Sequence, residues 1–245
     1  MNHRRVALVT GSATGIGRAV AWRLAERGYD LTINYSRSKV EAEETAVGVR
    51  ERGSNVALVQ ADVADDIAVR AMIERTVDEL GGLDLLVNNA ATTYFVPHTD
   101  LDGLTAQVWD DILNVNLKGT FFACRAAMPH LKRRHGNIVN IASVAGVAGS
   151  GSSIAYAASK GAVITLTKSL AKAFAPEVRV NAVAPGPVQT RWLADHQDMI
   201  DQAMISTPLK RPATADDVAA VVLFLAADTS LMTGQVLVVD GGRTI

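Results

Sequence analysis

Seven short apolar runs recur along the chain and alternate with longer stretches of helical periodicity. Most of the runs are continuously apolar, such as Leu85-Leu86-Val87, as is typical of strands covered by helices on both faces. The helices between them supply the crossover connections that parallel strands need. The sequence therefore predicts an α/β fold, a single doubly wound domain with a seven-stranded parallel sheet flanked by helices. The predicted strands are residues 6–10, 31–35, 56–60, 83–88, 137–142, 179–184 and 236–239. A first helix is predicted from the apolar pattern of Ala19, Val20, Leu24 and Ala25. The other predicted helices are residues 42–52, 67–80, 104–133, 154–173 and 216–227.

Length and composition indicate one domain over residues 1–245. A chain of 245 residues lies in the range where α/β folds remain single units. No repeat, low-complexity tract or linker rich in Pro, Gly and Ser divides it. Residues 146–153 are expected to form a mobile loop at the active site, not a boundary between domains.

Charge and apolar content exclude several classes of function. The 24 Lys and Arg residues are balanced by 25 Asp and Glu residues, so the basic excess of a nucleic-acid-binding protein is missing. No apolar stretch reaches the roughly 18 residues that a membrane span needs, and the N-terminus lacks the pattern of a secretory signal. We therefore expect a cytoplasmic protein without nucleic-acid or membrane partners.

Cysteine and histidine usage argues against a metal site. Cys124 is the single cysteine, so neither an internal disulfide nor a multi-cysteine metal site is expected. The five histidines, at positions 3, 98, 130, 135 and 196, show no close ligand spacing. The expected chemistry is free of metal.

Residues suited to ligand binding directly follow five of the predicted strands. In chain order they are Gly11, Asp62, Asn89, Ser143 and Pro185. Each alone has an ordinary explanation, such as a turn at Asn89 or a helix cap at Asp62. However, the carboxyl ends of parallel strands share one edge of the sheet, and ligands of such folds bind at that edge. The joint placement therefore predicts one binding site.

A glycine-rich turn joins the first predicted strand to the first predicted helix. Its sequence is Thr10-Gly11-Ser12-Ala13-Thr14-Gly15-Ile16-Gly17. Glycine permits a tight turn and the close approach of a ligand, and the helix N-terminus offers unpaired N–H groups to a pyrophosphate. The spacing Gly-x-x-x-Gly-x-Gly departs from the usual Gly-x-Gly-x-x-Gly dinucleotide fingerprint. A plain strand-to-helix turn is the alternative interpretation.

Tyr156 and Lys160 are four residues apart in a predicted helix, and Ser143 precedes Tyr156 by thirteen residues. The spacing of four places the phenol and the ammonium on one helix face. The ammonium favours the phenolate and so lowers the phenol pKa from about 10 towards the range used in acid–base catalysis. The Ser143 hydroxyl can hold the oxygen being protonated. Taken alone, the pair also fits a surface tyrosine beside a solvated lysine.

Together these elements resemble the short-chain dehydrogenase/reductase family. Asn88-Asn89-Ala90-Ala91, Asn116 and Pro185-Gly186-Pro187-Val188-Gln189-Thr190 extend the resemblance, in the family's order, over nearly the whole chain. The resemblance implies a Rossmann domain with the catalytic set Asn116, Ser143, Tyr156 and Lys160. It implies a cofactor site of Gly11, Ser12, Thr14, Gly15, Ile16, Gly17, Tyr35, Ser36, Arg37, Asp62, Val63, Asn89, Ala90, Ala91, Tyr156, Lys160, Pro185, Gly186, Val188 and Thr190. Ala91 replaces the family's usual glycine, and we expect binding to survive the added methyl group.

The resemblance also implies roles for these residues. A hydride would move between nicotinamide and a carbonyl or alcohol carbon, which is chemistry that belongs to the cofactor. Tyr156 would supply or remove the proton, and Ser143 would donate to the substrate oxygen. Lys160 would hold the nicotinamide ribose and lower the Tyr156 pKa, while Asn116 would secure a water joining Lys160 to solvent. The cellular cofactor ratio selects the working direction.

Cofactor choice depends on the end of the second predicted strand, which reads Asn34-Tyr35-Ser36-Arg37-Ser38. A carboxylate there would bind the adenosine ribose and repel a 2′-phosphate, but this segment has none. The planar fork of Arg37 could pair with a 2′-phosphate. We therefore predict NADP(H), with NAD(H) as the alternative because Arg37 also fits a solvated surface charge and Thr14 stands where some NADP-using relatives carry a basic residue.

The resemblance further implies a homotetramer, since relatives commonly assemble through the last strand and two long helices. A dimer is the alternative, and the apolar faces of residues 104–133 and 154–173 could also be satisfied within one chain. Asp240 is expected to organise the final turn. A substrate lid is expected at about residues 188–211, between proline-bounded ends.

For the substrate, the chain resembles the 3-oxoacyl-(acyl-carrier-protein) reductases. That interpretation predicts reduction of a carbonyl on an acyl-carrier-protein thioester, with basic residues at the entrance for the acidic partner; the candidates are Lys132, Arg133, Arg134 and Arg191. The substrate wall is expected in residues 92–99 and 144–154 and at Trp192, Leu193 and Met199. Two alternatives are a sugar or polyol dehydrogenase and a non-catalytic protein that senses NADP.

Overall fold

Seven strands form one parallel sheet in the order β3-β2-β1-β4-β5-β6-β7. The computed structural model describes residues 4–245, except for the side chain of Met199. The predicted doubly wound α/β fold is confirmed, since every neighbouring pair of strands is parallel. The strands are β1 (Val6–Val9), β2 (Asp30–Tyr35), β3 (Val56–Gln60), β4 (Leu85–Asn88), β5 (Asn137–Ile141), β6 (Arg179–Pro185) and β7 (Val236–Val239).

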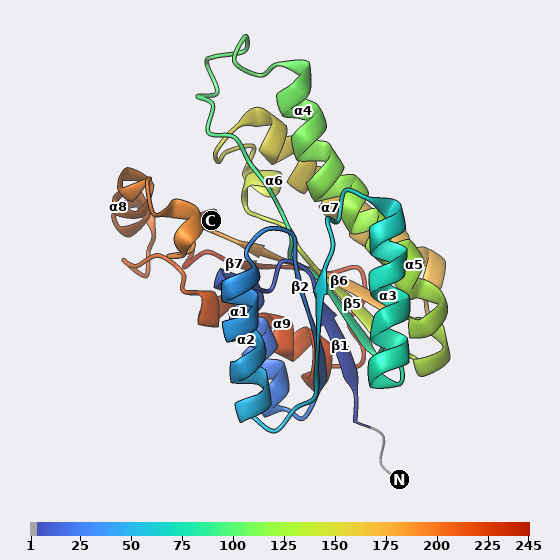
Figure 1. The fold of residues 1–245 in the computed structure, drawn as a ribbon. Helices are drawn as coiled ribbons and strands as arrows, with labels where there is room; N and C mark the ends of the chain where they lie inside the picture. The colour runs from blue at the N-terminus through green and yellow to red at the C-terminus, as the bar shows by residue number, and fades with distance from the viewer. Residues whose placement is uncertain (1–3) are drawn as a thin grey trace.

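Helices cover both faces of this sheet (Figure 1). The helices α1 (Gly15–Glu26), α2 (Lys39–Glu51) and α9 (Ala215–Leu223) enclose one apolar core with β1 and β2. On the other face, α3 (Asp66–Leu80), α5 (Thr120–Arg134) and α7 (Ile154–Phe174) enclose the second core. The remaining helices are α4 (Ala106–Leu113), α6 (Ala145–Ala148) and α8 (Gln197–Ser206). Burial on both faces explains why β1 is apolar throughout and why β4 and β5 are buried at every position, with apolar centres at Leu85-Leu86-Val87 and Ile138-Val139.

Three segments differ from the prediction. The single helix expected over residues 104–133 contains a π-helical turn at Asn114–Gly119, which separates α4 from α5. π-helical turns are rare and are defined by the hydrogen bonds of the folded backbone, so the sequence analysis did not indicate this one. The expected loop at residues 146–153 overlaps the short helix α6. The helix expected over residues 216–227 is α9 followed by a second π-helical turn at Phe224–Asp228. The residues of the expected lid, for which no secondary structure was predicted, contain a 3₁₀ turn at Arg191–Leu193 and the helix α8.

The strand order places a topological switch point between β1 and β4. The chain moves outward through β2 and β3 on one side and through β5, β6 and β7 on the other, so the loops after β1 and β4 diverge and leave a crevice at the carboxyl edge. A buried amide pair supports this edge, because the Asn88 Nδ2 donates to the Asn140 Oδ1 at 2.9 Å across β4 and β5. Asn140 thus has a structural role in the sheet.

Candidate active site

A cleft of about 660 Å³ follows the carboxyl edge of the sheet. Loops after six strands, β1 to β6, contribute to its lining, which brings together segments far apart in the sequence. Most of the predicted site residues lie on this cleft: Gly11, Thr14, Gly15, Ile16, Tyr35, Ser36, Arg37, Asp62, Val63, Asn89, Ala90, Ala91, Ser143, Tyr156, Lys160, Pro185, Gly186, Val188 and Thr190. Ser12, Gly17 and Asn116 do not line it.

The glycine turn after β1 is locked to the loop after β4. The Thr10 Oγ1 accepts hydrogen bonds from the N–H groups of Asn89 and Ala90, at 2.9 and 3.0 Å. In return, the Asn89 Nδ2 donates to the carbonyl oxygens of Thr10 and Gly11, both at 2.9 Å. Gly11 has a φ of +60°, and a Cβ there would lie 2.9 Å from the Ala90 Cα. Only glycine fits this crossing without displacement of the backbone.

Ser12 and Gly17 support the turn from behind. The Ser12 Oγ donates to the Val9 carbonyl at 2.8 Å and accepts from the Asn34 N–H at 3.0 Å, so the hydroxyl points into the protein. A Cβ on Gly17 would lie 2.6 Å from the Asn89 Nδ2. The Asn34 Oδ1 accepts from the Gly11 N–H at 3.0 Å. Asn34 was not predicted as a site residue; the available signal was a polar side chain inside an apolar strand.

Two helix N-termini that face the cleft lack a side-chain cap. The side chains at the N-caps of α1 and α2, Thr14 and Ser38, make no capping hydrogen bond, and α1 has no acidic residue in its first turn. By contrast, Asp65 caps α3 and Thr214 caps α9. Uncapped N-termini favour anionic groups. The glycine crossing and these two termini therefore fit a dinucleotide whose pyrophosphate lies at α1.

Positive charge predominates in the cleft. Its charged lining residues are Arg37, Asp62, Lys160, Arg191 and Arg243, so Asp62 is the one carboxylate among the described lining residues. Arg37 is exposed at the end of β2 and forms no ion pair with any residue in the described range 4–245. Its guanidinium is therefore available to an added phosphate, which fits a 2′-phosphorylated dinucleotide.

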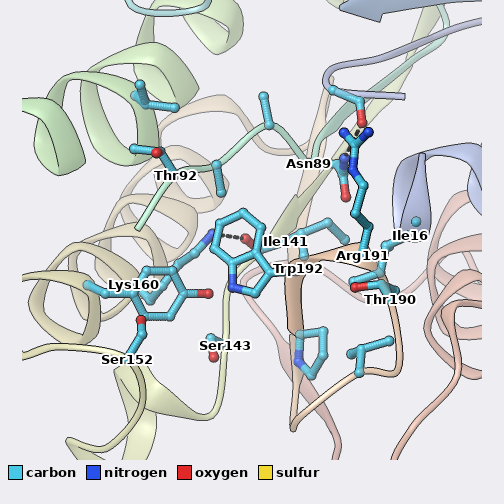
Figure 2. Close-up of a pocket in the computed structure, with 18 of the residues that line it drawn as sticks. Ile16, Asn89, Thr92, Ile141, Ser143, Ser152, Lys160, Thr190, Arg191 and Trp192 are labelled. Carbon is cyan, nitrogen blue, oxygen red and sulfur yellow. Dashed lines mark hydrogen bonds between the residues drawn. The ribbon is translucent and has the colours of Figure 1, made fainter. Parts of the chain in front are cut away.

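The proton-transfer residues gather where β5 and α7 meet the cleft. Lys160 is buried, and its Nζ donates to the Ile141 carbonyl oxygen at 2.8 Å (Figure 2). The same Nζ lies 5.8 Å from the centre of the Tyr156 ring. The Ser143 Oγ accepts from the Ala145 N–H at 3.1 Å, which orients the hydroxyl at the start of α6. The spacing of Tyr156 and Lys160 thus places both on one face of α7, as predicted.

Burial dominates the electrostatics of this pair. Burial raises the pKa of Tyr156 to about 12, and hydrogen bonding with Ser143 opposes that rise. Burial also lowers the pKa of Lys160 to about 8. The expected lowering of the Tyr156 pKa by Lys160 is therefore wrong for the polypeptide alone. The physical reason is that removal from water disfavours both charged forms more than the two groups favour each other.

Asn116 lies behind the cleft in the π-helical turn. Its Oδ1 accepts from the Thr92 N–H at 2.8 Å, and its Nδ2 donates to the Thr92 carbonyl and the Ser159 Oγ, both at 3.0 Å. The amide thereby ties the loop after β4 to α7 beside Tyr156. Thr92 and Ser159 were not predicted as its partners, because nothing in the sequence indicates that residues 92, 116 and 159 meet.

Aromatic side chains form the outer part of the cleft. Trp192 lies with its ring centre 6.2 Å from that of Tyr156, and Figure 2 draws it among the residues that line the cleft. Phe95 stacks on His196 at 3.6 Å between ring centres, which joins the loop after β4 to the segment before α8. Phe95, Trp192 and Leu193 line the cleft, as predicted for the substrate wall; the Met199 side chain lies outside the described part. Gln202 and Arg243 also line it and were not predicted.

The basic cluster at the end of α5 lies away from this cleft. Lys132, Arg133 and Arg134 immediately precede β5, and Arg134 donates to the Gly81 carbonyl at the end of α3. A helix that leads into a parallel strand ends at the amino edge of the sheet. The expectation that these three residues stand at the site entrance of their own chain is therefore wrong, whereas Arg191 does line the cleft.

Within residues 4–245, no three His, Cys, Asp or Glu side chains come together as a metal site. No helix of the same range is long and apolar enough to cross a membrane.

Comparisons with known proteins agree over almost the whole chain. A family model described as Enoyl-(Acyl carrier protein) reductase matches residues 11–244. The chain is 44% identical over 241 residues to a ketoacyl reductase assigned to the granaticin polyketide synthase of Streptomyces violaceoruber, covering 97% of this chain and 95% of that protein. It is 41% identical over 248 residues to 3-oxoacyl-[acyl-carrier-protein] reductase FabG of Staphylococcus aureus, covering 99% of each. A crystal structure of a short chain dehydrogenase from Burkholderia cenocepacia J2315 in complex with NADP superposes with a TM-score of 0.93 at 36% identity, covering 98% of both chains.

Proposed function

The chain belongs to the short-chain dehydrogenase/reductase family, and on that premise we propose that it is an NADP(H)-dependent oxidoreductase that reduces the ketone of a 3-oxoacyl thioester. One observation carries the proposal: Ser143, Tyr156 and Lys160 line the same cleft as Arg37, whose guanidinium forms no ion pair with any residue from 4 to 245. The similarity to two ketoacyl reductases supports the substrate class.

Each residue of the proposed catalytic set has a distinct task. Bound NADP(H) supplies the hydride chemistry. Tyr156 protonates the carbonyl oxygen, and its raised pKa keeps the phenol protonated at neutral pH. Ser143 donates a hydrogen bond to the same oxygen, and a donor of this kind is worth about 3 kcal/mol. Lys160 binds the nicotinamide ribose hydroxyls.

Asn116 acts from behind these residues. By holding Thr92 and Ser159, it fixes the wall of the cleft next to Tyr156. The role of Asn116 in holding a water beside Lys160 stays a prediction.

The proposed coenzyme residues divide along the cleft. Residues of the glycine turn and the α1 N-terminus face the pyrophosphate, and Ser36 and Arg37 face the 2′-phosphate. The loops after β3, β4 and β6, which line the same cleft, would hold the adenine and nicotinamide portions. Ser12 and Gly17 are supporting residues in this arrangement, because they shape the turn without lining the cleft.

We also propose a homotetramer, a lid at about residues 188–211 and a single domain over residues 1–245. The outer strand β7 is half-exposed, and Phe121 on α5 and Val238 on β7 present apolar side chains to solvent. Such unpaired apolar surface on an edge strand favours association.

An acyl-carrier-protein thioester is the proposed partner substrate. We propose the cytoplasm as its location, because a reductase that consumes NADPH works where NADPH is regenerated.

The test is a coenzyme assay with the purified protein. NADPH and NADH oxidation is followed with a 3-oxoacyl thioester, simple ketones, diketones and quinones, and glucose and polyols are tested with the oxidised coenzymes. Turnover of the thioester with a preference for NADPH is expected. Turnover of sugars alone would support the sugar or polyol dehydrogenase instead. Tight NADPH binding without turnover of any substrate would support the sensor.

A further inference from the structure

Arg191 crosses from the proposed lid to the helix α2. Its Nη1 pairs with the Glu41 Oε1 at 2.7 Å, and its Nη2 donates to the Ser38 Oγ at 3.1 Å. Ser38 is the N-cap of α2, and Glu41 lies in its first turn. This pair joins two segments 150 residues apart in the sequence.

The crossing lies over the coenzyme end of the cleft. Arg191, Ser38, Gly15 and Ile16 all line the cleft. In Figure 2, Arg191 extends away from Lys160 and Ser143, on the side of Ile16. A side chain that spans from Thr190 to the N-terminus of α2 therefore passes over the stretch between the proposed pyrophosphate site at α1 and the proposed 2′-phosphate site at Arg37.

The contact between Arg191 and Glu41 is a weak, solvent-exposed ion pair that can open. Arg191 and Glu41 side chains are 60% and 35% exposed, and exposed pairs of this kind are weak and screened by salt. The Glu41 pKa is lowered first by a hydrogen bond from its own backbone and further by Arg191, so the carboxylate stays charged at neutral pH. The Ser38 hydroxyl contacts Arg191 and makes no capping hydrogen bond to α2.

We propose that Arg191 is a clasp that positions and retains the coenzyme: its contact with Ser38 and Glu41 closes the lid over the adenosine half, and coenzyme leaves only when the contact opens. This rests on the proposed NADP(H) site. Arg191 also offsets the charge of Glu41, a carboxylate in the first turn of α2, the helix that begins just after Arg37. Loss of Arg191 therefore opens the lid and also leaves Glu41 with less positive charge around it, because only Arg18 then opposes it, whereas loss of the Glu41 charge opens the lid alone.

The two variants consequently differ in their effects on the two coenzymes. Arg191→Ala is expected to raise the dissociation rate of NADH about 3-fold and that of NADPH about 10-fold, the latter corresponding to 1.4 kcal/mol. Glu41→Gln is expected to raise the NADH rate by a similar factor, about 3-fold, and to raise the NADPH rate less than Arg191→Ala does. The Glu41→Gln variant leaves the Arg191 charge in place to face the phosphates.

Stopped-flow displacement of bound NADPH and NADH, followed by coenzyme fluorescence, measures these rates without substrate. Arg27→Ala is the matched control. Arg27 pairs with Asp228 at 2.9 Å, with 49% and 39% exposure, and joins α1 to the turn after α9 away from the cleft. Its removal is expected to leave both rates within twofold of the wild type.

The outcomes separate the clasp from the proposed function. Faster release in both cleft variants, with the larger NADPH effect in Arg191→Ala, supports the clasp. Release rates within twofold of wild type in either cleft variant, or an equal rise in Arg27→Ala, overturn it while the coenzyme site stands. A wild-type protein that binds neither coenzyme overturns the proposed function and the clasp with it.

Discussion

At the scale of single residues, the chemistry of the site follows from what surrounds Tyr156 and Lys160. Both groups titrate away from their ordinary values because the protein removes water from them. Tyr156 remains a proton donor over the whole neutral range. Lys160 carries a full ammonium only below pH values of about 8. The residue types could be read from the sequence, whereas the sign of the Tyr156 shift required its burial.

Tyr156→Phe removes the proton donor and leaves the ring packing intact. We expect kcat for ketone reduction to fall at least about a hundredfold, because general acid catalysis contributes about 10²–10⁴. The dissociation constant for NADPH, measured by fluorescence titration, should change less than twofold. Turnover close to that of the wild type would rule out the mechanism.

Arg37→Ala tests coenzyme choice. Loss of a charged hydrogen bond to phosphate costs about 1.5–3 kcal/mol, so the dissociation constant for NADPH should rise about tenfold or more. The constant for NADH should stay within twofold, because NADH lacks the 2′-phosphate. Equal weakening of both coenzymes would contradict the assignment of Arg37 to the 2′-phosphate.

The lowered Lys160 pKa makes stability depend on pH. Unfolding returns the pKa from about 8 to 10.5, so between these pH values the unfolded chain binds more protons than the folded one. The Lys160 contribution to the free energy of unfolding therefore increases as pH rises through this window, by up to about 3 kcal/mol. Above about pH 10 the raised Tyr156 pKa acts in the opposite direction.

Urea unfolding of the wild type and of Lys160→Met, from pH 7 to 10, isolates this contribution. The variant replaces the ammonium with an apolar side chain of similar length. As pH rises from 7 to 10, the free energy of unfolding of the wild type should increase relative to that of Lys160→Met. A difference that is constant with pH would contradict the lowered pKa.

At the scale of elements, the site depends on two crossings that hold loops together. The first locks the turn after β1 to the loop after β4 through Thr10 and Asn89. The second ties that same loop to α7 through Asn116 in the π-helical turn. Strands β1 and β4 are neighbours in the sheet, so their loops start close together, and the amide hydrogen bonds then fix the cleft wall.

Gly11→Ala should disrupt the first crossing. Its φ of +60° disfavours alanine, and the new Cβ would lie 2.9 Å from the Ala90 Cα. Gly53→Ala is the control, since Gly53 has a φ of +76° but nothing within 4 Å of a Cβ. Conformational strain alone costs about 1 kcal/mol. We expect Gly53→Ala to show only that loss in thermal or urea unfolding.

Gly11→Ala should lose at least about 1 kcal/mol more, because overpacking adds to the strain. It should also weaken NADPH binding, whereas Gly53→Ala should not. Equal stability losses and unchanged coenzyme affinity in both variants would contradict a role for the Gly11 crossing.

At the scale of the whole molecule, the two cores are complete but the sheet is open at β7. Val238 is 44% exposed on this edge strand. If the tetramer forms through β7, a charge there should be buried without a partner, which is costly. Val238→Lys should therefore reduce the assembly from tetramer to dimer in size-exclusion chromatography with light scattering.

Val47→Lys is the matched control for assembly. Val47 is 49% exposed on α2, on the opposite side of the sheet order from β7. This variant should keep the wild-type mass. A wild-type mass for Val238→Lys would argue against an interface at β7, and a monomeric wild type would refute the proposed tetramer.

The positions of the strands and of the binding edge of the sheet could be predicted from the sequence by itself. Apolar runs indicated the strands, because parallel strands covered on both faces are mainly apolar, and the boundaries of β3 and of the half-exposed edge strand β7 agree with the prediction to the residue. Strand succession also placed Gly11, Asn89 and Ser143 at one edge, because parallel strands end on the same side. These inferences depend on local pattern and on connectivity, which a sequence contains.

Only the tertiary structure decided the features that depend on contacts between distant segments. The π-helical turn at Asn114–Gly119 is defined by its backbone hydrogen bonds, and the amide of Asn116 meets Thr92 and Ser159 only after the chain folds. The pKa values of Tyr156 and Lys160 depend on how much water their neighbours exclude. Arg191 contacts Glu41, which is 150 residues away in the sequence. The basic residues Lys132, Arg133 and Arg134 lie at the amino edge of the sheet, away from the cleft. A sequence lists which groups exist, but distance and solvent exclusion set their energies, and both arise from the packing of the whole chain.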